Sequence, residues 1–172
     1  MTTAVRERPQ DEATGGSASA PATSMELVSV WLGKQLVGLP VAEVQDILGS
    51  QTITRVPQAA TEVAGVLNLR GRIVTAIDLR SRLGMPPRDK AAAGMSIVVE
   101  HRGEHYSLLI DRVGEVLEAP MDRYEADTST LSGGWREVAT GVIRLDSQLL
   151  VVLDVGRVLQ LTDVAPVRAG SR

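Results

Sequence analysis

The sequence lacks several residue types on which common functional sites depend. Among its 172 residues it has no Cys, no Phe, two Trp and two Tyr, so aromatic residues make up 2%. Without Cys, the chain can form no disulfide, no thiolate metal site and no Cys nucleophile. The scarcity of aromatic rings argues against a base-stacking surface. The net charge of −3 argues against the basic footprint that nucleic-acid binding requires.

Long apolar runs are also absent. The segment 149–153 is typical of the longest ones and is far shorter than the roughly 20 residues that a membrane-spanning helix needs, so we expect no direct membrane insertion. Residues 1–24 carry charges and no apolar centre of a signal peptide. Their composition predicts a disordered tail, as does that of residues 162–172. We therefore expect a cytoplasmic protein with one folded region at 25–161.

The pattern of the folded region predicts a mainly β structure. Short apolar runs alternate with Gly, Asp and Ser turn signals, which is typical of strands and hairpins. Hairpins are predicted at 27–39, 66–77, 95–110 and 138–153, short strands at 44–48 and 113–117, and a polar loop at 118–135. Asp78 and Asp154 each precede a short amphipathic run, and both are predicted to cap a helix.

The two halves of this region repeat each other. Gly65–Asp78 aligns without gaps on Gly141–Asp154, 76 residues later, and Val44–Leu48 aligns on Val113–Leu117. An ordered pair of such matches predicts an internal duplication.

One half alone is about the size at which a hydrophobic core becomes marginal. We therefore expect two small five-stranded barrels packed together, the first at 25–87 and the second at 95–161, with short helices. The groove between two barrels is a natural place for a partner.

A search for catalytic and metal-binding patterns finds no nucleotide-binding loop, zinc-protease motif or nucleophile elbow. His101 and His105 are four residues apart, but Arg102 and Gly103 between them indicate a hairpin turn, which breaks the spacing that a helix would give. We interpret both histidines as solvent-facing turn residues. The chain is thus predicted to have no catalytic residue, no metal and no cofactor.

One charged pair is not explained by these patterns. Asp46 lies in the apolar strand 44–48, and Arg70 is predicted to end the strand 66–70, just before Gly71. A charge among apolar residues usually needs a partner. Two alternatives are open: both side chains point to solvent, or they form an ion pair that joins two strands.

The order of these motifs resembles the CheW-like domain. The resemblance rests on VQDIL at 44–48, ITRVP at 53–57 and VAGVLNLRGRIVTAIDLR at 63–80, with weaker matches at 110–117 and 149–154. It implies two SH3-like barrels and a non-catalytic adaptor of bacterial chemosensory signalling. The implied partners are the regulatory domain of a CheA-type histidine kinase, contacted barrel to barrel, and the cytoplasmic tip of a methyl-accepting chemoreceptor. Such a protein associates with receptor arrays at the inner membrane.

By motif position, the resemblance places Asp46 and Arg70 in the region that couples receptor and kinase. It adds Val44, Gly65 and Asn68 to the same partner-binding set. A different function stays open from the residues: a CheW-like module that binds a small molecule or a protein in another two-component or motility pathway.

The chain departs from the family pattern at several positions. Val30 and Val37 stand where the family often has an aromatic residue, and Thr75 stands where it usually has Pro. Asp46 replaces the usual Glu and is one methylene shorter, which predicts a stretched or water-mediated bridge to Arg70.

Overall fold

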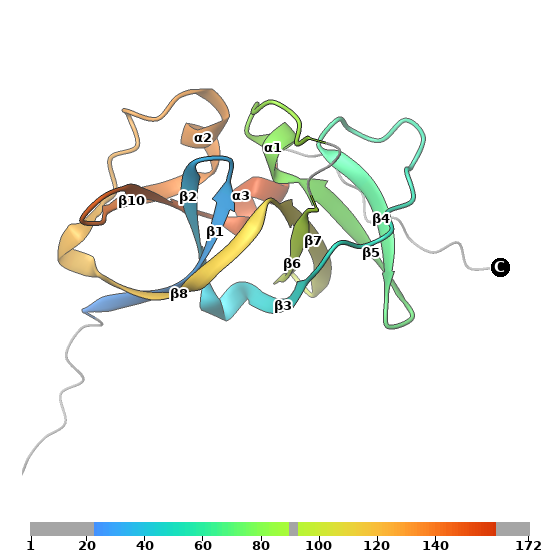
Figure 1. Ribbon diagram of the computed structural model, residues 1–172, viewed down its shortest axis with the longest axis horizontal. Helices are drawn as coiled ribbons and strands as arrows, with labels where there is room; N and C mark the ends of the chain where they lie inside the picture. Colours follow the sequence, from blue (N-terminus) through green and yellow to red (C-terminus); the bar gives the residue numbers. More distant parts are fainter. Residues whose placement is uncertain (1–22, 90–92, 161–172) are drawn as a thin grey trace, which may run out of the picture.

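The protein folds into two β-sheets that lie side by side (Figure 1). The computed structural model describes residues 23–89 and 93–160. The first sheet has six strands, in the spatial order β8 (Arg112–Pro120), β1 (Ser24–Leu32), β2 (Gln35–Pro40), β11 (Leu149–Leu153), β10 (Ala139–Arg144) and β9 (Tyr124–Glu125). The second has five, in the order β3 (Val44–Leu48), β6 (Met95–His101), β7 (Glu104–Ile110), β5 (Arg72–Asp78) and β4 (Val63–Leu69). The mainly β prediction is confirmed.

Each sheet takes strands from both halves of the sequence. β2 pairs in parallel with β11, and β5 in parallel with β7, while β1 pairs with β8 and β3 with β6. The expected division into a barrel at 25–87 and a barrel at 95–161 therefore does not describe the sheets. Periodicity in a sequence predicts which face of a strand is buried, but it does not identify the neighbouring strand.

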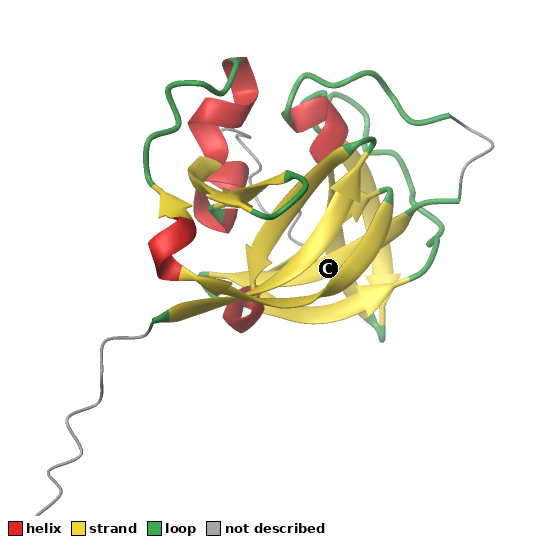
Figure 2. Cartoon of the chain, turned by 60° about the vertical axis from the view of Figure 1, so that its left-hand side comes forward, coloured by secondary structure: helices red, strands yellow, loops and turns green. Residues whose placement is uncertain are grey.

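Both sheets curl without closing into complete hydrogen-bonded rings (Figure 2). The edges of the first sheet are β8 and β9, and those of the second are β3 and β4. The predicted tails lie outside the described residues, apart from Thr23 and Ser24. Ser24 already begins β1.

The sequence repeat has a structural counterpart at its helices. Asp78 precedes α1 (Leu79–Arg82), and its Oδ1 accepts hydrogen bonds from the backbone N–H groups of Arg80 (3.0 Å) and Ser81 (3.4 Å). Asp154 precedes α3 (Val155–Gln160) and accepts from the N–H of Arg157 at 2.9 Å. The two predicted helix caps are confirmed.

The region predicted as a polar loop at 118–135 is more ordered than expected. It contains the 3-10 turn η2 (Met121–Arg123), the short strand β9 and the start of α2 (Gly133–Val138). A second 3-10 turn, η1 (Val41–Glu43), connects β2 to β3. Gly133, Gly134 and Ser132 favour a loop by local propensity, and the buried Val138 at the end of α2 shows that tertiary packing stabilises this helix.

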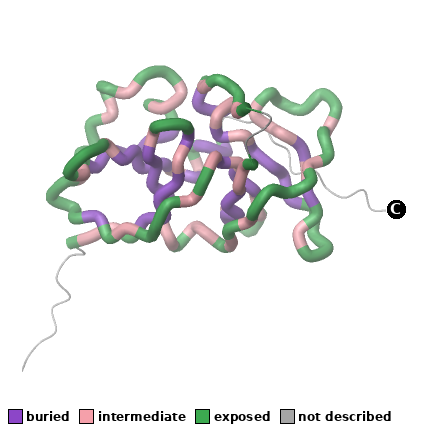
Figure 3. Tube along the Cα trace, in the orientation of Figure 1, coloured by how far each residue is buried: buried purple, intermediate pink, exposed green. Residues whose placement is uncertain are grey.

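The hydrophobic core has one main cluster between the sheets and a smaller cluster within the curl of each (Figure 3). The main cluster includes Val30 and Val37, which lie directly opposite each other in β1 and β2 and are fully buried. The cluster within the first sheet consists of Leu27, Leu36, Ala119, Ile143, Leu150 and Val152, and that within the second of Leu67, Val74 and Ala76. Aliphatic side chains thus fill the interior of both sheets.

Candidate functional site

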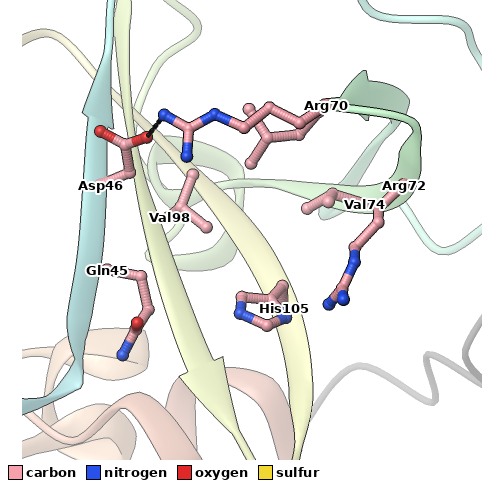
Figure 4. A pocket seen from close by; sticks show the side chains of 8 residues that line it. Gln45, Asp46, Arg70, Arg72, Val74, Val98 and His105 are labelled. Atoms are coloured by element: carbon pink, nitrogen blue, oxygen red, sulfur yellow. Dashed lines mark hydrogen bonds and ion pairs between the residues drawn. The ribbon is translucent and has the colours of Figure 1, made fainter.

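Asp46 and Arg70 form a direct ion pair across the open seam of the second sheet, which is the gap between its two edge strands, β3 and β4. Asp46 lies on the edge strand β3, and Arg70 lies in the turn that follows the opposite edge strand, β4. The distance from Arg70 Nη2 to Asp46 Oδ2 is 3.2 Å, and Asp46 Oδ1 also accepts the N–H of Ile47 at 2.9 Å (Figure 4). Of the two alternatives, the structure has the ion pair, and the shorter Asp side chain reaches its partner without a bridging water.

This ion pair is exposed. The Arg70 side chain is 83% exposed and that of Asp46 32%. Exposed pairs typically contribute ~0–1 kcal/mol to stability, because solvent screens them and ordering both side chains costs entropy. The pair therefore orients two accessible charged groups more than it stabilises the fold.

The sequence predicts that Arg70 ends a strand, but in the structure β4 ends at Leu69 and Arg70 lies in the following turn. Its φ is 52° and that of Gly71 is 83°, so both central residues of the two-residue turn have the left-handed backbone of a type I′ hairpin. Asn68 supports the turn, because its Oδ1 accepts the N–H of Gly71 at 2.9 Å. The turn projects the Arg70 side chain away from its own strands and toward β3 (Figure 4).

The other two predicted residues, Val44 and Gly65, are more buried than Arg70. Val44 is half-buried against the main core. Gly65 is buried with φ 147°, and a Cβ there would lie 2.1 Å from the carbonyl oxygen of Thr54. Thr54 needs this close approach, since it exchanges two backbone hydrogen bonds of 2.8 Å with Val66. The structure thus groups Asp46, Asn68 and Arg70 at the surface and gives Val44 and Gly65 supporting positions.

A cavity of about 290 Å³ lies beside the ion pair. It is lined by Gln45, Asp46, Leu69, Arg70, Arg72, Val74, Val98 and His105 (Figure 4). Arg72 and His105 were missed as site residues. Arg72 follows the Gly71 turn signal and reads as an ordinary strand residue. The sequence predicts His105 as a solvent-facing turn residue, but it belongs to β7 and is half-buried, with its Nε2 3.7 Å from Oε2 of Glu100.

A second charged cluster lies where the two sheets meet. Asp111, between β7 and β8, contacts Arg80 of α1, accepts a hydrogen bond from Nε of Arg88 at 2.9 Å, and accepts the N–H of Gly33 from the β1–β2 turn. Burial alone would raise the pKa of Asp111, but the hydrogen bonds from Arg80, Gly33 and Arg88 together hold that pKa well below its usual range. The cluster fastens the β1–β2 turn to the second sheet.

Glu43 in η1 has the opposite shift. Burial, and next to it the negative charge of Asp154, raises the pKa of Glu43, while His101 lowers it. Glu43 therefore binds a proton more readily than an exposed Glu does.

Within residues 23–89 and 93–160, no group of three or more His, Asp or Glu side chains is arranged to hold a metal ion. No helix in this part of the chain is long and apolar enough to cross a membrane.

Comparison with known proteins assigns the family. A family model described as the CheW-like domain matches residues 26–163. The chain is 28% identical to the "Probable chemotaxis protein CheW" of Rhizobium etli, over 80% of this chain and 89% of that protein. It is also 28% identical to "Protein PilI" of Pseudomonas aeruginosa, over 78% of this chain and 79% of that one.

A solved structure agrees with this assignment. The crystal structure of the scaffolding protein TtCheW from Thermoanaerobacter tengcongensis superposes with a TM-score of 0.69 at 26% identity, and the match covers 76% of this chain and 89% of that chain. The chain belongs to the CheW-like domain family.

Proposed function

We propose that this protein couples the cytoplasmic tip of a methyl-accepting chemoreceptor to the regulatory domain of a CheA-type histidine kinase. As a CheW-family member, the chain is a non-catalytic adaptor of chemotaxis signalling. The observation that carries the proposed coupling role is the Asp46–Arg70 pair with its Asn68-supported turn. It presents polar groups at the open seam of a sheet without making a large contribution to stability.

The finer assignments are part of this proposal. The kinase contact is barrel to barrel, and the protein is held at receptor arrays beside the inner membrane. Asp46, Asn68 and Arg70 contact a partner directly, whereas Val44 and Gly65 hold the two edges of the second sheet in place. Gly65 is buried, so its contribution to binding is indirect.

Reconstituted kinase activity tests the coupling. Receptor fragments and the kinase encoded nearest to the gene are assembled in vesicles with and without this protein, and receptor-dependent phosphorylation is measured. We expect stimulation that is reduced at least several-fold by Arg70→Ala and unchanged by Arg102→Ala, at an exposed turn of the same sheet. If the protein neither stimulates the kinase nor binds either partner, the proposal is wrong.

A second candidate is an adaptor of another motility or two-component pathway. The observation that favours it is the similarity to a relative named PilI, which has the same identity to the chain as the Rhizobium etli relative (28%) over nearly the same share of the chain, 78% against 80%. Pull-downs against every CheA-type kinase of the source genome separate the two candidates, because the pathway follows the kinase that is retained.

A further inference from the structure

The two sheets carry equivalent cavities. The cavity of the second sheet lies beside the Asp46–Arg70 pair. The cavity of the first sheet has a volume of about 350 Å³ and is lined by Ser29, Trp31, Leu36, Gly114, Glu115, Leu117, Leu145 and Gln148. The strand registers establish the equivalence. Thr75 pairs with Tyr106 in one sheet as Val151 pairs with Val37 in the other, and both β3 and β8 have a register shift at the same place of the repeat.

The equivalent positions share their apolar residues but not their charges. Leu69 corresponds to Leu145, and each lines its cavity together with other aliphatic side chains, Val74 and Val98 in the second sheet and Leu36 and Leu117 in the first. The basic positions differ: Arg70 corresponds to Asp146, Arg72 to Gln148 and His105 to Leu36. Because one sheet folds with Asp, Gln and Leu at these positions, the repeat does not need basic side chains there in order to fold. We look for their role outside folding.

The free cation in the second-sheet cavity is Arg72. Arg70 is already paired with Asp46, and His105 lies 3.7 Å from Glu100. The side chain of Arg72, by contrast, has no hydrogen bond or ion pair with any residue in the described ranges 23–89 and 93–160. Arg72 and His105 both line this cavity, and their side chains are drawn in Figure 4. The cavity thus offers an unneutralised charge next to a second nitrogen donor, above Val74 and Val98.

We propose that this cavity binds an acidic side chain of a protein partner. The carboxylate lies between Arg72 and His105, and neighbouring aliphatic groups of the partner pack on Val74 and Val98. A volume of about 290 Å³ is at the lower limit of small-molecule sites and suits one or two inserted side chains. Opposite charge across such an interface favours both encounter and correct register. This inference rests on the proposed adaptor function and names the chemistry of the partner at that site.

The test replaces Arg72 and His105 with the residues that their counterparts carry. The double variant Arg72→Gln, His105→Leu installs the residue types of Gln148 and Leu36, which an equivalent site already tolerates. Arg102→Gln, at an exposed position on the same sheet, changes the net charge by the same amount and is the control. Affinity is measured by calorimetry against the purified receptor cytoplasmic fragment and kinase regulatory domain encoded nearest to the gene, at two salt concentrations.

We expect the double variant to bind one of the two fragments about ten-fold more weakly, with a weaker salt dependence, while the control binds normally. Charge reversal, Arg72→Glu, should weaken binding further. Binding of the Arg72→Glu variant should be restored when the acidic residue of the partner fragment that enters the cavity is changed to Lys. If the double variant is not folded, the single exposed change Arg72→Gln decides by the same criterion.

The outcomes separate this inference from the proposed function. If the wild-type protein binds neither fragment, the adaptor proposal itself fails. If the wild type binds and the variants bind equally well, only the acidic-side-chain site is overturned. A different result would assign the cavity to a small carboxylate. In that case free glutamate shifts the NMR resonances of the His105 ring in a saturable way, and the variants have no effect on fragment binding.

Discussion

Arg70 and Arg102 occupy the same position of two type I′ turns, and both have φ 52°. Each is followed by Gly with a positive φ, 83° at Gly71 and 80° at Gly103. Left-handed backbone is unfavourable for a long side chain such as Arg, and Asn and Gly tolerate it better. The two turns belong to the same sheet, but among the residues that the structure describes only Arg70 reaches an acidic partner, Asp46.

The first prediction compares Arg70→Asn with Arg102→Asn. Because Asn tolerates the left-handed backbone conformation better than Arg, Arg102→Asn should raise the stability by up to about 1 kcal/mol. The Arg70 variant should gain less, because it also loses the ion pair, and the difference should be below ~1 kcal/mol. Urea unfolding measures both. Of these two variants, only Arg70→Asn should reduce receptor-dependent kinase stimulation, as Arg70→Ala is expected to do. If Arg70→Asn instead strongly lowers stability while coupling stays normal, the role of Arg70 is structural.

The second prediction concerns acid stability. Because the folded-state pKa of Asp111 is depressed, its ionised form stabilises the fold above the unfolded-state pKa of about 4. That contribution is lost as the pH falls toward the lower, folded-state pKa. Asp111→Asn should cost about 2–4 kcal/mol at pH 7, since Arg80 and Arg88 lose their shared carboxylate. Its stability should then change less than that of the wild type between about pH 5 and 2.

Asp146→Asn is the control for this measurement. Asp146 pairs with Arg123 at 3.1 Å, but its side chain is 94% exposed, so its removal should leave the stability and its pH dependence nearly unchanged. Equal acid profiles for the wild type and Asp111→Asn would contradict the role given to Asp111.

The third prediction tests the close approach at Gly65. Gly65→Ala should destabilise the protein by about 2 kcal/mol or more, because the new Cβ collides with the Thr54 carbonyl and φ 147° is unfavourable for Ala. Gly49→Ala, where a Cβ meets nothing within 4 Å, should change stability by less than about 0.5 kcal/mol. Thermal unfolding of the two variants provides the comparison, and similar melting temperatures would refute the steric argument.

The fourth prediction concerns Val30 and Val37, which stand at two positions where the family often has an aromatic residue. Val30 and Val37 face each other and are fully buried, so an added ring has no free space. Val30→Phe should therefore lower stability by about 1–3 kcal/mol through overpacking. Val116→Phe, at a position 65% exposed, should have little effect. A stabilised Val30→Phe protein would instead show that the core has room for the aromatic residue.

Much of the fold could be predicted from the sequence because it depends on local signals. The hairpins, the strands at 44–48 and 113–117, and the helix caps Asp78 and Asp154 follow from alternation, turn residues and capping chemistry. The exchange of strands could not be predicted, since β2 and β11 are more than 100 residues apart and their pairing is decided by tertiary packing.

The candidate site was predicted in part for the same reason. The motif identified Asp46 and Arg70, and of the two alternatives that the sequence left open the structure has the ion pair. Arg72 and His105 were missed because each looks like an ordinary solvent-facing strand residue until strand pairing and the curl of the sheet bring them to one cavity with Gln45 and Asp46 of β3. Comparison of the repeat halves could have found them, since both replace uncharged residues of the other copy.

The shared strands also dictate an order of assembly during synthesis. The five-stranded sheet has all its strands once Ile110 has left the ribosome, whereas the six-stranded sheet must await β11, which ends at Leu153. The β1–β2 hairpin is thus made first and enclosed last. Until then its edges and the buried faces of Val30 and Val37 have only part of their final cover. A nascent chain stalled between these two points should hold a protease-resistant five-stranded sheet and a protease-sensitive first hairpin.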